Sequence, residues 1–268
     1  MNPSFQSLAS LARQRVITAI FNAKKGHIGG ALSSIDLMLY LYLNKLVTMH
    51  PGGSTSVSER PFVLSKAHSA TGLLAVISVL DKAHESILDS YNTGGSLVGN
   101  NPSEQVPGVE FHAGSLGHGI SFGAGLALAK KLGEPIDYVT VFVSDGELHE
   151  GSCWEGLLFI AHHDLDVCVI VDNNHQICEA RTDSAVSLGH LEGKFKAFGF
   201  TTLCIDGHSL SDLRKIDAFI TGARWPRAIV ADTIKGKGVS FMEKVIRFHH
   251  SIPSREEFDS AMAELRAS

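Results

Sequence analysis

The chain has 268 residues, of which 44% are hydrophobic and 19% are charged, and its formal net charge at pH 7 is −5. This length and apolar content are sufficient for a buried core and exclude an intrinsically disordered chain. The mildly acidic balance, without a run of Lys or Arg, argues against binding to nucleic acid or to a membrane surface.

The N-terminal part of the chain has helical patterns at 5–24, 33–46 and 70–83. It begins without a basic region followed by an apolar stretch, and no apolar run reaches about 18 residues, so we expect a soluble, cytoplasmic protein. A stretch rich in Gly, Asn and Pro follows at 93–114. Long loops in compact domains are often functional, which marks this stretch as part of a site.

The second half alternates short apolar runs with helical patterns. The runs at 138–144, 167–172, 201–206 and 227–232 are rich in Val and Ile, as is typical of strands buried on both faces. The helical patterns occupy 120–132, 154–163, 188–198 and 211–221, and a last helix is expected from Ser254, which forms a capping box with Glu257. This alternation predicts an α/β fold with a mainly parallel sheet flanked by helices. The chain contains no internal repeat or linker, so we expect one domain over residues 1–268.

Four cysteines lie in this second half, and none forms a C-x-x-C pair. Cys168 and Cys204 fall inside predicted strands. We therefore expect reduced thiols rather than disulfides or metal ligands at Cys153, Cys168, Cys178 and Cys204.

Polar residues follow two of the predicted strands. Asp145 and Gly146 come directly after the strand at 138–144, and Asn173 and Asn174 come directly after the strand at 167–172, so that 29 positions separate Asp145 from Asn174. Ligands of open parallel sheets bind at this edge, and carboxylate and amide oxygens suit Mg²⁺, which often shares phosphate oxygens. Gly146 and the helix start behind it would let a diphosphate approach the backbone. Asp-Gly and Asn-Asn are also ordinary turn pairs, but their occurrence together favours a metal–diphosphate site.

The run SDGELHE, followed by this Asn pair, resembles the thiamine diphosphate fingerprint in its transketolase version. Further stretches that are similar to that family follow in order: KGHIGG (25–30), ERPFVLSKAHS (59–69), PGVEFHAGSLGHGI (107–120), DGELHEGSCWEG (145–156) and KGKGVSFME (235–243). The resemblance runs from about residue 8 to residue 250 and covers the diphosphate-binding domain of the family. It implies the thiamine diphosphate-binding fold.

The resemblance also implies roles for single residues. Asp145, Asn174 and the backbone carbonyl of Gln176 would ligate Mg²⁺. Cofactor contacts, in addition to Asp145 and Asn174, would come from Lys66, Gly114, Leu116, Gly146, Glu147 and Lys235. Glu150 would be an acid at the subunit interface that couples paired sites.

Three histidines match positions of the family that contact cofactor or substrate, namely His27, His68 and His249. An imidazole can donate a hydrogen bond to a ketose hydroxyl or a phosphate oxygen, and it can move protons near neutral pH. For His84, His162, His163 and His250, an ordinary surface position is the expectation.

The function implied by the resemblance is transfer of a two-carbon ketol unit from a ketose to an aldehyde. The pyrimidine-binding and C-terminal domains of the family have no match here, so we expect them on a separate partner subunit, in an α2β2 assembly. The glutamate that activates the cofactor belongs to the pyrimidine domain, and this chain alone is therefore expected to be inactive.

The sequence departs from the family pattern at three positions. Ser144 replaces the first glycine of the fingerprint, and His118 stands where Gln is more usual. In GNNPSE, Asn101 occupies the place of a histidine that hydrogen-bonds the hydroxyls of the two-carbon unit. We therefore expect substrates other than the ordinary pentose phosphates.

Two other functions stay open on the sequence alone. One is the α-subunit of a 2-oxo acid dehydrogenase or decarboxylase, which the histidine-bearing KGHIGG and SKAHS segments disfavour. The other is a non-catalytic subunit of the same fold. The intact Asp145, Asn174, His27 and His68 argue against that function.

Overall fold

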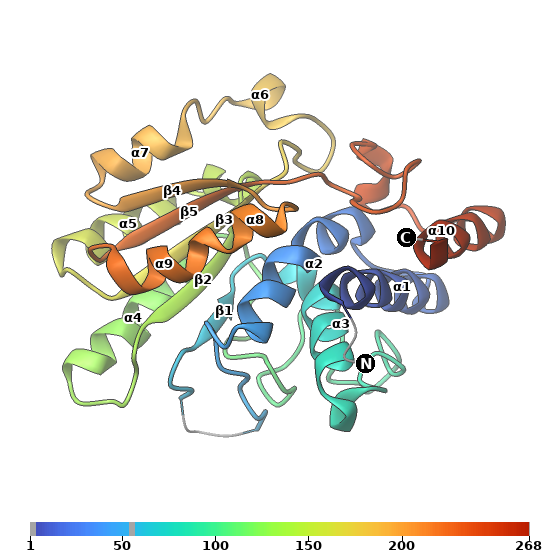
Figure 1. The fold of residues 1–268 in the computed structure, drawn as a ribbon, viewed down its shortest axis with the longest axis horizontal. Coiled ribbons are helices and arrows are strands. Elements are labelled where there is room, and N and C mark those ends of the chain that lie inside the picture. Colours follow the sequence, from blue (N-terminus) through green and yellow to red (C-terminus); the bar gives the residue numbers. More distant parts are fainter. Residues whose placement is uncertain (1–3, 54–56, 268) are drawn as a thin grey trace.

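The computed structural model describes residues 4–53 and 57–267. A five-stranded sheet with the order β1-β2-β3-β5-β4 lies at its centre, and all pairings between neighbours are parallel (Figure 1). The strands are β1 (Phe62–Leu64), β2 (Val139–Ser144), β3 (Val167–Asn173), β4 (Thr201–Asp206) and β5 (Arg227–Asp232). The α/β fold with a parallel sheet is confirmed. Strand β1 escaped the sequence analysis because its apolar run is only three residues long.

Helices cover both faces of the sheet. Along β2, Val139, Val141 and Val143 point into one apolar layer, while Phe142 points into the other, as the two-residue period of a strand requires. The first layer is completed by α4 (Gly119–Lys131), α5 (Gly151–His162) and α7 (Leu191–Ala197). The second is completed by α1 (Phe5–Ala23), α2 (Ile28–Leu43), α3 (Ala70–Leu80), α8 (Leu210–Leu213), α9 (Lys215–Gly222) and α10 (Arg255–Ala267).

The predicted helices occur with some changes at their ends. The capping box at the start of α10 is confirmed, since Ser254 and Glu257 exchange bonds of 2.9 and 3.2 Å. Helix α2 begins at Ile28 rather than at residue 33, and so contains two glycines. A side chain at Gly29 would lie 3.0 Å from the backbone oxygen of Phe248, so this helix needs glycine for close packing. The helix expected at 211–221 is divided into α8 and α9, and a short α6 (Thr182–Ala185) precedes α7.

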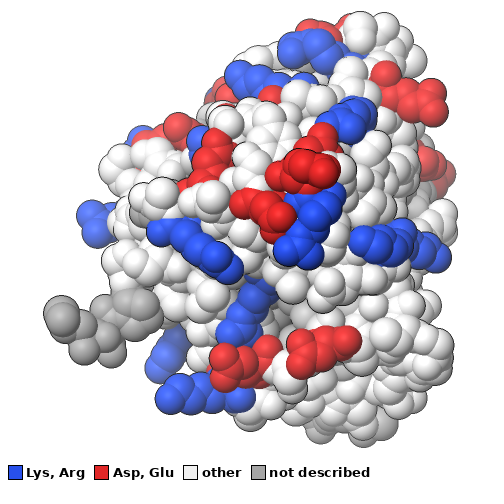
Figure 2. All heavy atoms as spheres, turned by 90° about the vertical axis from the view of Figure 1, so that its right-hand side faces the viewer, with Lys and Arg blue, Asp and Glu red and all other residues white. Residues whose placement is uncertain are grey.

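The outer surface carries both signs of charge. Figure 2 shows the side of the molecule formed by α1 and α10, where Lys and Arg side chains are interspersed with Asp and Glu. Such a mosaic produces a weaker long-range field than a surface of one sign. Within residues 4–53 and 57–267, the helices are too short or too polar to cross a membrane.

Candidate active site at the carboxyl edge of the sheet

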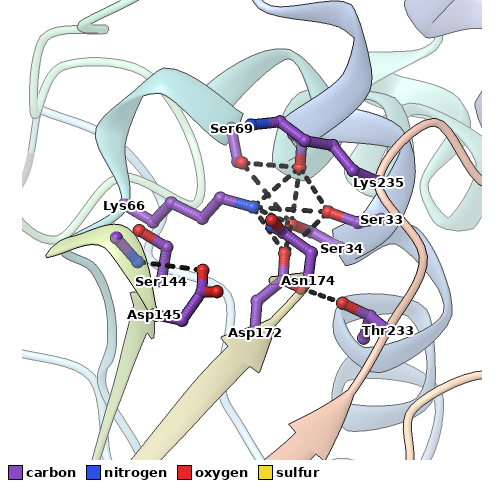
Figure 3. A network of polar contacts seen from close by, with 12 residues as sticks. Ser33, Ser34, Lys66, Ser69, Ser144, Asp145, Asp172, Asn174, Thr233 and Lys235 are labelled. Carbon is purple, nitrogen blue, oxygen red and sulfur yellow. Dashed lines mark hydrogen bonds and ion pairs between the residues drawn. The ribbon is translucent and has the colours of Figure 1, made fainter. Parts of the chain in front are cut away.

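The ends of β2 and β3 bring the two halves of the fingerprint together. Ser144 is paired with Asp172, and the amide of Asp145 donates to the carbonyl of Asp172 over 3.2 Å. Asp145 and Asn174 therefore project from neighbouring strand ends, as Figure 3 shows. This juxtaposition follows directly from the parallel register of the two strands.

Asp145 is a buried carboxyl group with an unused acceptor. It is 1% exposed, and its Oδ1 accepts the amide of Gly146 at 2.9 Å. Among the described residues, Oδ2 has no hydrogen-bond partner. Burial, together with the nearby Asp172 carboxylate, raises the pKa of Asp145 to about 6. A cation at Oδ2 would compensate this charge and satisfy the oxygen.

Asn174 and Gln176 complete the predicted ligand set on the same edge. Both are buried, and Asn174 Oδ1 accepts the amide of Gln176 at 3.2 Å. Between them, His175 has a φ of 61°, a left-handed conformation that turns the chain sharply. The oxygens of an aspartate, an asparagine and a backbone carbonyl form the hard donor set that Mg²⁺ prefers.

Lys235 supplies positive charge beside these oxygens. Its ammonium donates to the carbonyl oxygens of Gln176 and Ile177, both at 3.2 Å, and the residue is 3% exposed. Burial, and next the charge of Lys66, lower the pKa of Lys235 to about 8. A diphosphate bound beside Lys235 would pair with its ammonium group and offset the free-energy cost of burying that charge.

Contacts of His208, Asp36 and Arg13 hold the backbone just before Lys235. His208 accepts the amide of Ile234 at 2.9 Å and contacts the Asp36 carboxylate at 2.6 Å through its other ring nitrogen. The same carboxylate pairs with Arg13 at 2.6 Å. This buried chain of contacts fixes the backbone at the start of the segment.

Lys66 occupies a different place from the other predicted cofactor ligands. It lies beneath the cleft, 1% exposed, and forms an ion pair with the fully buried Asp172. Its ammonium also donates to Gly30 O at 2.9 Å and to Ser34 at 3.1 Å. Burial opposes ionisation of Asp172, but the adjacent Lys66 lowers the pKa of that carboxyl group. Figure 3 shows the resulting network, which joins α2, the turn before α3 and the ends of β3 and β5.

Glu147 is also buried, and its oxygens bind the protein. They accept the hydroxyl of Ser65, the amide of Gly117 at 2.9 Å and the amide of Ser144 at 3.4 Å. Ser65 Oγ in turn accepts the amide of Gly119 at 3.1 Å. Burial raises the pKa of Glu147. The carboxyl group thus holds the loop that presents Leu116 to the cleft.

Histidines form one wall of the cleft. The ring of His27 lies 5.4 Å from that of His68 and 5.3 Å from that of His249, between centroids. Burial is the main cause that lowers the pKa of His27 to about 4 and that of His249 to about 3. The pKa of His68 is lowered too, again by burial. All three rings are therefore neutral at pH 7 and can donate or accept hydrogen bonds.

A fourth histidine belongs to this wall. The ring of His250 lies 4.5 Å from His27 and 4.3 Å from His249. His250 was expected to be an ordinary surface residue. Its side chain is exposed, but it lines the cleft beside His27 and His249, so the expectation was wrong about its surroundings. The one available signal was its position next to His249, since a turn after a short helix can aim both side chains at one cleft.

These elements enclose a cleft of about 390 Å³. Eleven of the fourteen predicted site residues line it, all except Lys66, Asp145 and Glu150. Asn100, Ile177 and Cys178, which the sequence analysis missed, line it as well. The lining comprises His27, His68, Asn100, Asn101, Gly114, Leu116, Ser144, Gly146, Glu147, Asn174, Gln176, Ile177, Cys178, Lys235, His249 and His250. Asp145 is not one of these lining residues; it borders a neighbouring hollow of about 570 Å³ between β5 and α7.

Two predicted residues lie toward the outside. Asn101 is exposed at the mouth of the cleft. Glu150 is exposed at the start of α5 and is not part of the cleft lining, so its place at a subunit interface stays a prediction. Gly117 lies beside it with a φ of 85°, where an added side chain would meet Glu150 at 2.7 Å.

The site fits a divalent metal ion with a diphosphate. Within the part of the chain that the structure describes, Asp145 Oδ2 and the side-chain oxygen of Gln176 are both buried without a hydrogen-bond partner. Lys235 provides the cation on the other side. Hard oxygens and a lysine around one cleft form the combination that metal-bound phosphates require.

Comparison with known proteins agrees with this assignment. Residues 4–265 match the family model described as "Transketolase, thiamine diphosphate binding domain". An apulose-4-phosphate transketolase subunit of Phocaeicola vulgatus is 32% identical over 256 residues, which cover 94% of this chain and 90% of that protein. The 6-deoxy-6-sulfo-D-fructose transketolase subunit SqwG of a Clostridium species is 29% identical over 263 residues, with 97% and 95% covered.

Solved structures share the fold. Transketolase from Campylobacter jejuni superposes with a TM-score of 0.86 at 22% identity, and transketolase from Leishmania mexicana with 0.83 at 23%. In both, 99% of this chain is covered. The chain spans 43% and 44% of the length of those two chains.

Proposed function

The chain belongs to the transketolase family, whose members are transferases that use thiamine diphosphate with a divalent metal ion, and from this we propose that it is the N-terminal, diphosphate-binding subunit of a two-component transketolase. Its substrates would be a ketose donor and an aldehyde acceptor. The relatives named as transketolase subunits favour this function over that of a 2-oxo acid dehydrogenase subunit.

One observation carries the proposal for the cofactor. Asp145 is buried, lacks a partner for Oδ2 among the described residues and lies beside Asn174 at adjacent strand ends. In our proposal, Asp145, Asn174 and the carbonyl of Gln176 hold Mg²⁺, and Lys235 and Gly146 contact the diphosphate. When bound, thiamine diphosphate supplies the carbon nucleophile that breaks and forms the carbon–carbon bond of the sugar.

The remaining residues of the chain orient the substrate. His27, His68 and His249 are neutral near pH 7 because their pKa values are lowered, so they can hydrogen-bond sugar hydroxyls without carrying charge. Leu116 and Ile177 provide apolar contact and exclude water from the cleft. Glu147 and Lys66 act indirectly, by holding the loop and the strand ends in place.

The partner is part of the proposal. Two relatives with nearly full coverage are named as subunits, and this supports a second chain that carries the pyrimidine and C-terminal domains. An α2β2 assembly, with residues 1–268 as one domain, follows from the family architecture. Leu158 and Phe159, 57% and 42% exposed on α5, would be covered by that partner.

The substrate is proposed to be a sugar outside the common pentose phosphates. Two relatives are named for apulose 4-phosphate and for a sulfonated fructose. Here Asn101, at the cleft mouth, replaces a histidine of the family. A neutral amide is shorter than an imidazole and selects a different set of hydroxyls.

Binding of the cofactor tests the proposal. Titration calorimetry with thiamine diphosphate and Mg²⁺ on the reconstituted complex should give Mg²⁺-dependent binding that Asp145→Ala abolishes. Asp259→Ala, which removes an exposed carboxylate on α10, is the matched control and should bind as the unmodified chain does. Unchanged Mg²⁺-dependent affinity in Asp145→Ala would overturn the metal assignment.

A further inference from the structure

Three imidazoles converge at the open end of the cleft. His27 precedes α2, while His249 and His250 lie at the end of the short helix η4 (Ile246–His249). Each ring can offer one nitrogen such that the three atoms lie within 4.8 Å of one another. Two distant segments therefore form a compact group of three nitrogen donors.

Backbone packing fixes this arrangement. The backbone at Gly29 lies close to that of Phe248, since a Cβ atom added at Gly29 would be 3.0 Å from the carbonyl oxygen of Phe248. The amide of Gly236 donates to the carbonyl of Gly29 at 3.0 Å, so the segment before η4 is joined to α2 as well. The start of α2 and the end of η4 are thus held together independently of the histidine rings.

Two of the three rings have an unused buried nitrogen. Within the described residues, Nδ1 of His27 and Nδ1 of His249 are buried without a hydrogen-bond partner, and His249 as a whole is 7% exposed. A ring nitrogen without a partner is available to bind a ligand. His250 is exposed, and its ring packs 4.5 Å from that of His27 and 4.3 Å from that of His249.

We propose that His27, His249 and His250 form a binding site for a divalent metal ion of the zinc class, separate from the magnesium site at Asp145. Imidazole nitrogens suit Zn²⁺, Ni²⁺ or Cu²⁺, whereas Mg²⁺ prefers oxygen. With Zn–N bonds of about 2.0–2.1 Å, tetrahedral ligands lie about 3.4 Å apart, so the ring nitrogens approach one another by up to about 1.4 Å on binding. Three protein ligands leave a fourth position open to the cleft.

This site has a functional consequence. The three histidines line the cleft that would take the sugar, so a bound ion excludes the substrate and inhibits the enzyme. Lys235 lines the same cleft, and its charge opposes a cation there. The metal site is therefore expected to bind its ion in the micromolar rather than the nanomolar range. This inference does not depend on the sugar specificity of the enzyme.

Titration of the full chain with Co²⁺, in the presence of excess Mg²⁺, tests the site through its visible absorption. We expect one equivalent of Co²⁺ with the intense bands of a four-coordinate ion, and displacement of it by Zn²⁺. His250→Ala changes an exposed side chain that the core does not need, and it should weaken the affinity for Co²⁺ at least ten-fold. His162→Ala, on the exposed face of α5, is the matched control and should leave the affinity unchanged.

Three results would overturn the site: no stoichiometric binding, only the weak bands of six-coordinate Co²⁺, or the same affinity in His250→Ala as in the unmodified chain. Because the readout is absorption rather than turnover, these results do not bear on the proposed transketolase function. Loss of sugar turnover in the complex on addition of Zn²⁺, reduced in His250→Ala, would connect the site to inhibition.

Discussion

Asp145 is held in the folded chain as a buried carboxyl group close to a second one, Asp172. Its pKa of about 6 lies above the ordinary value of 3.8, so the folded chain binds a proton more tightly there than the unfolded chain does. Without a metal ion, ionisation of Asp145 above about pH 6 lowers the free energy of unfolding. The residue that binds the cation is therefore poorly accommodated in its absence, as is common at functional sites.

The pH dependence of stability follows from this cost. We compare the free energy of unfolding of Asp145→Asn with that of the metal-free unmodified chain. The difference in favour of Asp145→Asn should grow by up to about 3 kcal/mol as the pH rises from about 4 to about 7.5. The reason is that ionisation of the folded carboxyl group is penalised throughout that window. Urea unfolding of both chains in a chelator measures the difference, and a constant difference across this pH range would contradict the role assigned to Asp145.

Asn101 is the residue at which substrate choice should change. A histidine there can donate a stronger hydrogen bond to a ketose hydroxyl, about 1.5–3 kcal/mol if charged against about 1 kcal/mol for a neutral pair. The complex should therefore use xylulose 5-phosphate poorly, and Asn101→His should raise kcat/KM for it by about ten-fold. Full activity of the unmodified complex on that sugar, unaffected by the substitution, would show that Asn101 does not select the donor.

Among the structural elements, the loop before α4 depends on one buried carboxyl group. Glu147 accepts three donors, and a glutamine would turn an N–H group toward one of them. A buried donor left without a partner costs about 1–3 kcal/mol, so Glu147→Gln should weaken cofactor affinity about ten-fold. Hydrogen exchange at Gly117 and Gly119 should also accelerate. Glu155→Gln on the exposed face of α5 is the control, and slow exchange in both variants would show that Glu147 does not hold the loop.

The ends of β3 and β5 depend on the ion pair between Lys66 and Asp172. Lys66→Met leaves a fully buried carboxylate unpaired, which should lower the free energy of unfolding by about 3–5 kcal/mol. The loss should shrink in acid, because the lowered pKa of Asp172 stabilises the fold only while this group is ionised. Lys130→Met breaks a partly exposed pair with Asp166 and should cost no more than about 1 kcal/mol. Equal losses in the two variants, measured by denaturant unfolding, would refute the role of the buried pair.

At the scale of these elements, much of the fold could be predicted for a physical reason. Buried parallel strands require unbroken apolar runs, and four of the five strands are long enough to be visible as such. The start of α2 was missed because Gly29 and Gly30 look like helix breakers, whereas close packing against Phe248 requires Gly29 inside the helix. Such long-range contacts leave no local pattern.

The difference between local patterns, which can be predicted, and long-range contacts, which cannot, also applies to the site. Asp145 and Asn174 were placed together because neighbouring parallel strands bring their carboxyl ends to one edge. The roles of Lys66 and Glu147 were harder to predict, because a charged residue in a motif can bind a ligand or bind the protein. Only the contacts of Lys66 with Asp172, and of Glu147 with Ser65 and Gly117, distinguish the two.

For the whole molecule, the histidines and the predicted diphosphate contacts line one cleft of this chain. The covered share of the solved transketolase chains, 43–44%, corresponds to one part of a larger enzyme. The exposed apolar residues Leu158 and Phe159 on α5 are consistent with a surface that a partner covers. Activity should therefore depend on a second chain that completes the cofactor site.

Reconstitution of two-carbon transfer is the measurement that tests this dependence most directly. The purified chain, the purified pyrimidine-domain subunit and their mixture would each be assayed with hydroxypyruvate or a ketose as donor, and with a 2-oxo acid for comparison. We predict activity only in the mixture, only with both thiamine diphosphate and Mg²⁺, and on the ketol donors rather than the 2-oxo acid. Full activity of this chain alone as a monomer, or turnover of the 2-oxo acid instead of the ketol donors, would contradict the proposed function.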